Sequence, residues 1–176
     1  MPLTANLLPS TVPPTSFATP FDRATSFAEN QAFTASGAIN NHNTQIDLGG
    51  VAQSPSAGLG SGVGRVSGIW CVNVSTMDFA SLDETYRLFL LASNDVAWGN
   101  GNVDLLAFHD FASVTAGRII PTLMGQSLAA PTQLRIPFIN LKQGLLYRYL
   151  RCNIVITGST PQATLTSWLS FSREMM

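Results

Sequence analysis

The chain has 176 residues, of which only 11% are charged, and its nine basic and ten acidic residues give a formal net charge of −1. Typical soluble domains carry about 25% charged residues, so a surface this poor in charge fits a chain that is packed into an assembly, or alternatively a β protein whose surface is rich in Thr, Ser, Asn and Gln. Lys and Arg do not cluster anywhere in the sequence, which excludes the basic stripe that neutralises phosphates in nucleic-acid-binding proteins.

Residues 1–28 are rich in Pro, Thr and Ser and show no regular apolar period, which predicts an extended N-terminal arm. Apolar side chains are scattered through this arm, and a solvated linker would not need them, so we expect the arm to order against a neighbouring subunit or to fold back on its own domain. Four of them are candidate partner-binding residues: Leu7, Leu8, Phe17 and Phe21. The arm lacks the basic and apolar regions of a signal peptide, so we expect no export. The longest apolar run, residues 88–92, is too short to cross a bilayer.

Residues 29–176 consist of short apolar segments broken by Gly, Asn and Pro, which is typical of a β-sandwich or barrel. No segment keeps the 3.6-residue period of an amphipathic helix. The number of strand-like segments suits two packed sheets, so we predict an all-β sandwich. The predicted strands are residues 31–36, 44–48, 66–75, 85–92, 103–111, 118–123, 133–139, 147–157 and 163–172.

Alternation along the strands predicts which face of each is buried. In residues 147–157 the even-numbered side chains from Leu150 to Ile156 are apolar, so this face is expected to line the core. His109 lies on an apolar face of the segment 103–111, and we expect it to be a hydrogen-bonded structural residue. The other members of this face are Val103, Leu105, Ala107 and Phe111.

The segment of residues 49–64 contains six glycines and no strand-like pattern, which predicts a long exposed loop. Its glycines lack the spacing of a dinucleotide-binding motif, and no Gly-Lys-Ser/Thr follows them, so phosphate binding is not expected. The dipeptide Asn100-Gly101 predicts a tight turn between the strands of residues 85–92 and 103–111.

The sequence offers no convincing catalytic or redox constellation. His109-Asp110 could be part of a nucleophile triad, but no nucleophile-elbow sequence supplies an exposed serine. Cys71 and Cys152 lie in separate strand-like segments and form neither a redox motif nor a zinc site. We expect both to be small buried residues, with a disulfide between them as the alternative. We therefore predict that the protein is not an enzyme and carries no cofactor.

One turn offers oxygen ligands that could hold calcium: Asp95, Asn100, Asn102 and Asp104. Their spacing does not match an EF-hand, and the preference of Asn and Asp for turns explains them without a metal, so we predict no metal site. Trp98 stands in the same polar loop. Because the other two tryptophans fall in strands, Trp98 is the aromatic residue that we expect to be free to contact a partner or a sugar.

Several stretches resemble a known family. They are the sequence QAFTAS at residues 31–36 with TQIDLG at 44–49, LASND at 91–95, and RYLR at 148–151 running into residues 152–158 and the last strand. Together, over roughly residues 29–172, they resemble the Bordetella-phage type of tailed-phage capsid cement (decoration) proteins. The arm of residues 1–28 and the length of the loop 49–64 depart from the shorter family pattern, so no family binding residue is carried over.

The resemblance implies a jelly-roll sandwich that assembles as a homotrimer and is made in the host cytoplasm. It also implies a place on the outer surface of the phage head, at three-fold positions, where the protein clamps neighbouring subunits of the major capsid protein without catalysis. The main alternative is a tail or fibre binding module that reads carbohydrate through Trp98. A small hydrolase using an exposed His109 and a jelly-roll major capsid protein are further alternatives.

Overall fold

The computed structural model describes residues 23–50, 65–79, 81, 83–99, 103–112 and 132–171. Four predictions lie wholly or mainly outside these ranges: residues 1–22 of the arm with their four apolar candidates, residues 51–64 of the glycine-rich loop, the turn Asn100-Gly101 and the strand 118–123. The described residues form antiparallel sheets, which confirms the all-β prediction. Their helical residues occur only in two 3-10 turns, and no helix among them could span a membrane.

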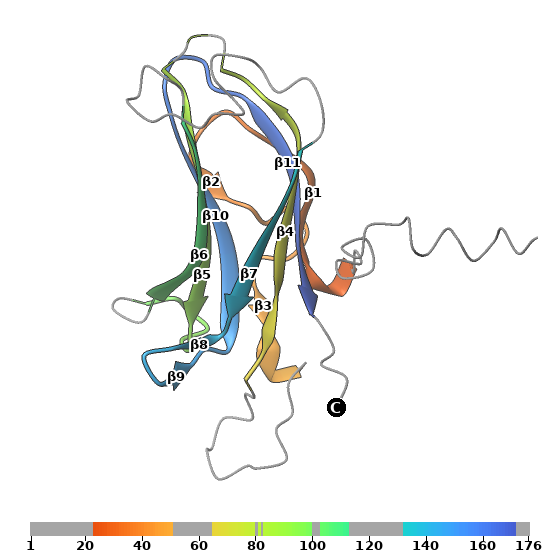
Figure 1. Ribbon diagram of the computed structural model, residues 1–176, viewed down its shortest axis with the longest axis vertical. Coiled ribbons are helices and arrows are strands. Elements are labelled where there is room, and N and C mark those ends of the chain that lie inside the picture. Colours follow the sequence, from red (N-terminus) through yellow and green to blue (C-terminus); the bar gives the residue numbers. More distant parts are fainter. Residues whose placement is uncertain are drawn as a thin grey trace, which may run out of the picture.

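Two sheets pack face to face (Figure 1). The four-stranded sheet has the order β1 (Ser26–Phe33), β11 (Ala163–Phe171), β4 (Ser67–Met77) and β7 (Thr132–Ile139). The five-stranded sheet has the order β2 (Gly37–Ala38), β10 (Tyr149–Thr157), β5 (Thr85–Ser93) and β6 (Val103–Ala112), and β3 (Ile46–Asp47) also pairs with β10. A small hairpin, β8 (Leu141–Lys142) with β9 (Leu145–Leu146), lies at one end. The 3-10 turns are η2 (Arg23–Thr25) and η3 (Leu48–Gly50).

The long strands coincide with the predicted segments, but the start of the domain does not. The strand predicted at residues 31–36 begins at Ser26 as β1 and ends at Phe33. Phe27 and Ala28 are fully buried, and the Thr25 hydroxyl donates a hydrogen bond to the carbonyl of Leu169 at 2.7 Å. The boundary predicted at residue 28 is therefore wrong, because residues 23–28 pack into the folded domain.

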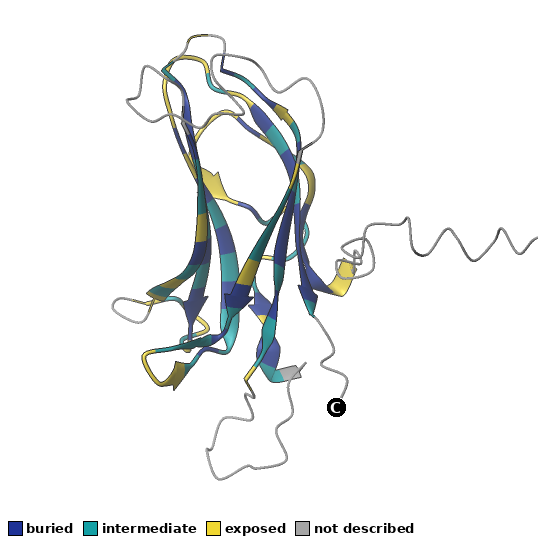
Figure 2. Cartoon of the chain, viewed as in Figure 1, coloured by how far each residue is buried: buried dark blue, intermediate teal, exposed yellow. Residues whose placement is uncertain are grey.

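The core lies between the two sheets, as the burial colours in Figure 2 show. The predicted inner face of β10 is confirmed, since the side chains of Leu150, Cys152, Ile154 and Ile156 are at most 7% exposed. Trp70 is fully buried, and its indole N–H donates to the Ser167 hydroxyl at 2.9 Å. Both cysteines are buried free thiols, so the alternative of a disulfide is wrong.

The predicted inner face of β6 is only half correct. The pairing of β5 with β6 shifts by one residue between Leu90 and Leu91, which leaves Leu106 as the extra residue of a β-bulge. One extra residue exchanges the two faces of the strand beyond the bulge, so Ala107 and Phe111 face the core. Val103 and Leu105, on the other side of the bulge, are instead 44% and 37% exposed.

Three described edge strands carry features that hinder the addition of another strand. The exposed Pro137 lies in β7, where a proline cannot donate a backbone hydrogen bond. On β6, the ammonium group of Lys142 donates to the carbonyl of Leu105 at 3.3 Å. The pairing of β1 with β11 is interrupted by register shifts between Ser26 and Gln31. Proline, charge and bulges are common protections of sheet edges.

Candidate interaction surface

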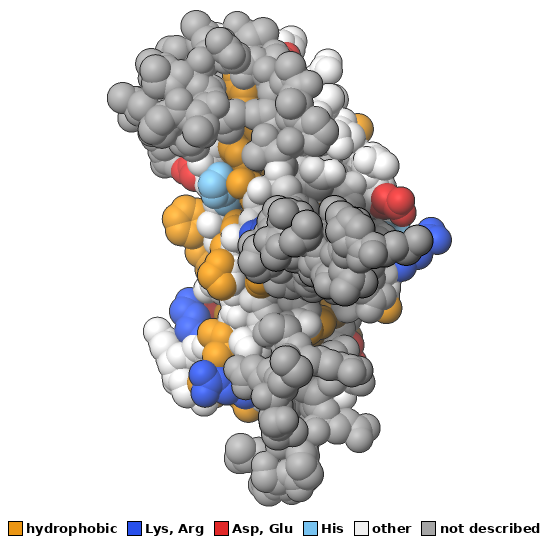
Figure 3. All heavy atoms as spheres, turned by 45° about the vertical axis from the view of Figure 1, so that its right-hand side comes forward, with side chains coloured by type: hydrophobic (Ala, Val, Ile, Leu, Met, Phe, Trp, Pro, Cys, Tyr) orange, Lys and Arg blue, Asp and Glu red, His pale blue; other side chains and the backbone are white. Residues whose placement is uncertain are grey.

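The outer face of the five-stranded sheet carries apolar side chains where water-facing residues would be expected. Cross-strand pairs place Phe89 of β5 beside Phe108 of β6, and Leu91 of β5 beside Leu105 of β6. Phe108 is 58% exposed, and Val155 of β10 is 37% exposed. We call these five side chains, Phe89, Leu91, Leu105, Phe108 and Val155, the outer patch. Figure 3 shows hydrophobic side chains gathered along the left of that view, with Lys and Arg side chains among the lower ones.

The sequence of β5 explains half of this surface. Residues 88–91 are a continuous apolar run, so apolar side chains alternate onto both faces of the strand. Leu88 and Leu90 fill the core, which leaves Phe89 and Leu91 on the outside. On β6 the bulge at Leu106 adds Leu105 to the outer face. Because no part of the described chain covers this apolar patch, it is a candidate site of protein interaction.

Two arginines border the outer patch. Arg87 is paired across β5 and β10 with Val155, and its Nε lies 3.7 Å from a carboxylate oxygen of Asp110. Arg151 is paired with Leu91, and its guanidinium carbon lies 4.5 Å from the centre of the Trp98 ring. Burial of this guanidinium lowers the pKa of Arg151 from its ordinary value.

Trp98 is held in place from three directions. Its indole N–H donates to the side-chain oxygen of Gln45 at 2.8 Å, and Arg151 covers one face of its ring. Its backbone has a positive φ of 56°, in a turn where the carboxylate of Asp95 accepts from the N–H groups of Ala97 and Gly99, each at 2.8 Å. The residue predicted to be free is therefore half-buried and rigidly placed at the margin of the outer patch.

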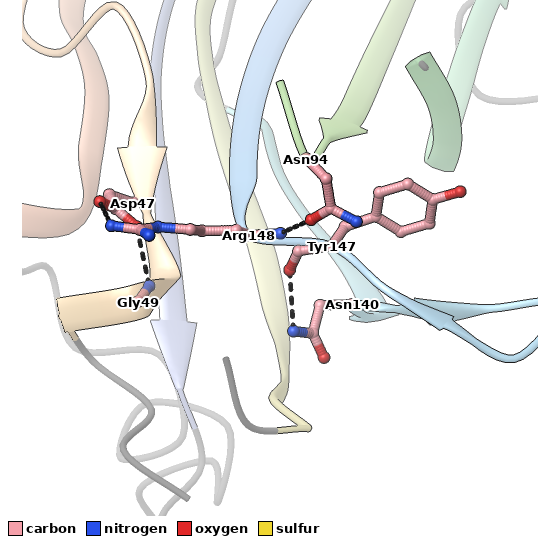
Figure 4. A network of polar contacts seen from close by, with 6 residues as sticks. All are labelled: Asp47, Gly49, Asn94, Asn140, Tyr147 and Arg148. Atoms are coloured by element: carbon pink, nitrogen blue, oxygen red, sulfur yellow. Dashed lines mark hydrogen bonds and ion pairs between the residues drawn. The ribbon is translucent and has the colours of Figure 1, made fainter. Parts of the chain in front are cut away.

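A polar network fixes the end of the sandwich beside Trp98 (Figure 4). Arg148 donates two hydrogen bonds to the carboxylate of Asp47, at 2.7 and 2.8 Å, and its backbone N–H donates to the side chain of Asn94 at 2.9 Å. The side chain of Asn140 donates to the carbonyl of Tyr147 at 3.0 Å. Hydrogen bonding to Arg148 lowers the pKa of Asp47 from its ordinary value. These bonds tie β3 and the hairpin to β10, which makes the surface nearby stiff.

The oxygen ligands proposed for calcium have other partners. Asp95 accepts the turn hydrogen bonds described above, and Asp104 accepts from the ammonium of Lys142 at 2.9 Å and from the hydroxyl of Tyr147. Hydrogen bonds from Lys142 and Tyr147 lower the pKa of Asp104 from its ordinary value. Asn100 and Asn102 lie outside the described residues. Across the described ranges, no group of three or more His, Cys, Asp or Glu side chains is placed to hold a metal ion.

His109 is half-buried on β6, and the described residues place it in no triad. Its ring makes an edge contact with Phe111 at 4.4 Å between ring centres. Its neighbour Asp110 lies on the opposite face of β6, beside Arg87. The contacts of the described residues join His109 to no serine and no carboxylate, and the hydrogen bond predicted for it is not among them. The hydrolase alternative therefore finds no support in this geometry.

His109 should make stability depend on pH. Burial lowers its pKa below the ordinary value of 6.5, because the charged imidazolium loses hydration. The folded state then binds the proton less tightly than the unfolded chain, so stability present above the ordinary pKa is lost as the pH falls through the lowered one. We expect His109→Gln to lose less stability than the wild type between about pH 7 and 5. Urea unfolding at a series of pH values measures this, and parallel curves would contradict it.

The described side chains of this surface are of types that are suited to binding. Its elements are an exposed apolar patch, two bordering arginines and a rigid tryptophan, which are the side-chain types enriched where protein interfaces gain most of their affinity. The sequence analysis identified Trp98 but missed Phe89, Phe108, Arg87 and Arg151. The chain matches no protein-family model and no curated protein sequence.

Proposed function

We propose that this protein is a structural virion protein, a capsid cement or decoration protein that binds the outer surface of a phage head and clamps neighbouring major capsid subunits. The observation that carries the proposal is the outer patch, an apolar surface on the outer face of a sheet in a chain with few charges. A protein that holds subunits together needs buried area and shape fit, which the outer face of a sheet can supply.

The strand order supports the jelly-roll part of this proposal. Each sheet alternates strands from the two ends of the chain, with β11 between β1 and β4 and β10 between β2 and β5. The chain therefore passes from one sheet to the other several times, for example from β4 to β5, from β6 to β7 and from β10 to β11, as chains do in jelly rolls. Viral capsid domains are among the proteins that use this architecture. The resemblance in residues 29–172 points to the same class of protein, and to a homotrimer.

The alternative of a carbohydrate-reading tail or fibre module depends on Trp98. Arg151 occupies one face of that indole and Gln45 accepts its N–H. The structure therefore gives no specific reason to favour sugar stacking over protein binding.

Light scattering of the purified protein, followed by co-sedimentation with capsids that lack it, tests the proposal. We expect a trimer that pellets with the capsids. We further expect Phe108→Ser to weaken capsid binding at least 10-fold, because hot-spot aromatics contribute at least about 1.4 kcal/mol to an interface. The free energy of unfolding should change by no more than about 1 kcal/mol, since Phe108 is more than half exposed and loses only its cross-strand contact with Phe89.

Leu145→Ser is the matched control for this experiment. Leu145 is as exposed as Phe108, at 58%, but lies on the β8–β9 hairpin and not on the sheet face. It should bind capsids as the wild type does. Two outcomes would argue against the proposed use of this face. One is a protein that does not pellet with capsids, and the other is a Phe108→Ser variant that pellets as well as the wild type.

A further inference from the structure

We propose that the outer patch receives an acidic segment of its protein partner, whose carboxylates pair with Arg151 and Arg87 while an apolar side chain between them packs on Phe89 and Phe108. The proposal rests on the proposed function, because it specifies the chemistry of the partner that this face binds. Two observations support it: each arginine has a buried Nε without a hydrogen-bond acceptor, and the two arginines are four residues apart along the sheet.

Arg151 lacks a counter-charge within the described part of the chain. The ion pairs recorded there join Arg87 to Asp110, Lys142 to Asp104 and Arg148 to Asp47. The Nε of Arg151 is buried and has no hydrogen-bond acceptor, and its Nη2 makes only a 3.4 Å contact with the Gln45 side chain. A guanidinium that is partly removed from water gains from a carboxylate placed in its plane. Stacking on Trp98 holds that plane ready.

Arg87, at the other end of the patch, also has an Nε without a hydrogen-bond acceptor. This Nε is buried, and Asp110 at 3.7 Å is too far away for a hydrogen bond. Arg87 and Arg151 lie on adjacent strands, and their cross-strand partners Val155 and Leu91 place them four residues apart along the sheet. That separation is about 13 Å, at a rise of roughly 3.3 Å per residue.

This spacing fits an extended partner segment with acidic residues at positions i and i+4. In such a segment the residue at i+2 points to the same side, over the row that contains Phe89, Phe108 and Asn153. The recognised pattern is therefore acidic-x-apolar-x-acidic. The apolar middle position distinguishes this partner from nucleic acid, whose phosphates are met by rows of basic residues.

The chain itself does not supply this pattern. Residues 1–22 contain a single acidic residue, Asp22, and nowhere in the sequence are two acidic residues four positions apart. Neither the N-terminal arm nor a strand of a second copy can therefore satisfy both arginines. The occupant is a different protein, which under the proposed function is the capsid subunit.

Capsid binding by Arg151→Met and Arg87→Met tests the inference. Methionine keeps an apolar stem and removes the charge, so we expect each variant to bind roughly 30-fold more weakly, as for hot-spot arginines. Each should also show a weaker dependence of affinity on salt concentration. Arg135→Met is the matched control, because Arg135 lies on β7 of the other sheet and donates to Gln133. It should bind as the wild type does.

A peptide experiment separates this inference from the proposed function. The peptide Thr-Asp-Thr-Leu-Thr-Asp-Thr should shift the indole N–H signal of Trp98 in NMR spectra, and the version with Asn in place of Asp should not. If both Met variants bind capsids as tightly as the wild type and with the same salt dependence, the inference is overturned. The proposed function is then unaffected. If the wild type does not bind capsids, the proposed function fails. If, in addition, both peptides shift the indole N–H signal of Trp98 equally, the inference fails too. A short single-stranded oligonucleotide that shifts the signal as strongly as the acidic peptide would also overturn it.

Discussion

Replacing Trp70 by alanine is expected to lower the free energy of unfolding by about 3–5 kcal/mol, which is the usual cost of deleting a buried tryptophan. Trp70 is fully buried in β4, between Leu169 of β11 and Ile136 of β7 in the four-stranded sheet. Its loss leaves a cavity between the sheets and removes the hydrogen bond to the Ser167 hydroxyl. Urea denaturation followed by fluorescence or circular dichroism measures the change.

Two further variants make this experiment decisive. Trp70→Phe keeps most of the ring and removes the N–H, so it should cost about 1–3 kcal/mol even if the alanine variant does not fold. Trp98→Ala removes a half-buried ring outside the core, together with its hydrogen bond and its arginine contact, and should cost about 1–2 kcal/mol. An alanine variant at Trp70 that is no less stable than the one at Trp98 would show that the core is not organised as described.

Replacing Gly158 by alanine is expected to cost about 2–4 kcal/mol, from backbone strain and overpacking together. Gly158 has a φ of +113°, a conformation that residues with a side chain rarely adopt. A Cβ atom there would lie 2.6 Å from the Cα of Glu84 and 3.0 Å from the carbonyl oxygen of Asp83. Both contacts are to backbone, which cannot move aside as a flexible side chain would.

Gly37→Ala is the control for Gly158→Ala. A Cβ atom at Gly37 would meet nothing within 4 Å, so the free energy of unfolding should change by less than about 1 kcal/mol. Thermal and urea unfolding of the two variants compares them directly. Equal stabilities would mean that the turn after β10 can relax around a side chain.

Sequence patterns predicted the sandwich well where the strands alternate cleanly. The inner faces of β10 and β5 follow from residues such as Ile154 and Leu88, because one buried face imposes a period of two. The same rule failed along β6, where the bulge at Leu106 exchanges the faces. Nothing in the local sequence marks that residue, since the bulge is a property of the pairing between two strands. The early start of β1 was hidden because Phe27 follows a proline-rich stretch.

The candidate surface could be predicted only in part. The apolar run of residues 88–91 carried a signal, because large apolar side chains on both faces of a strand leave one set facing outward. No sequence signal pointed to Arg151 and Arg87, since their spacing across two strands depends on the register of β10 with β5. Trp98 stood out as a tryptophan in a polar loop, but its contacts with Gln45 and Arg151 join residues far apart in the sequence.

The edges of the sheets affect whether many copies of this protein can lie close together without aggregating strand by strand. A decorated shell would hold many copies at high local concentration, a condition under which exposed strand edges start fibril growth. Pro137 on β7, Lys142 over β6 and the irregular register of β1 each interrupt the continuous ladder that such growth requires. Under the proposed function, contacts through the sheet faces stay open while strand-by-strand polymerisation is hindered, so we expect each copy to remain a separate unit.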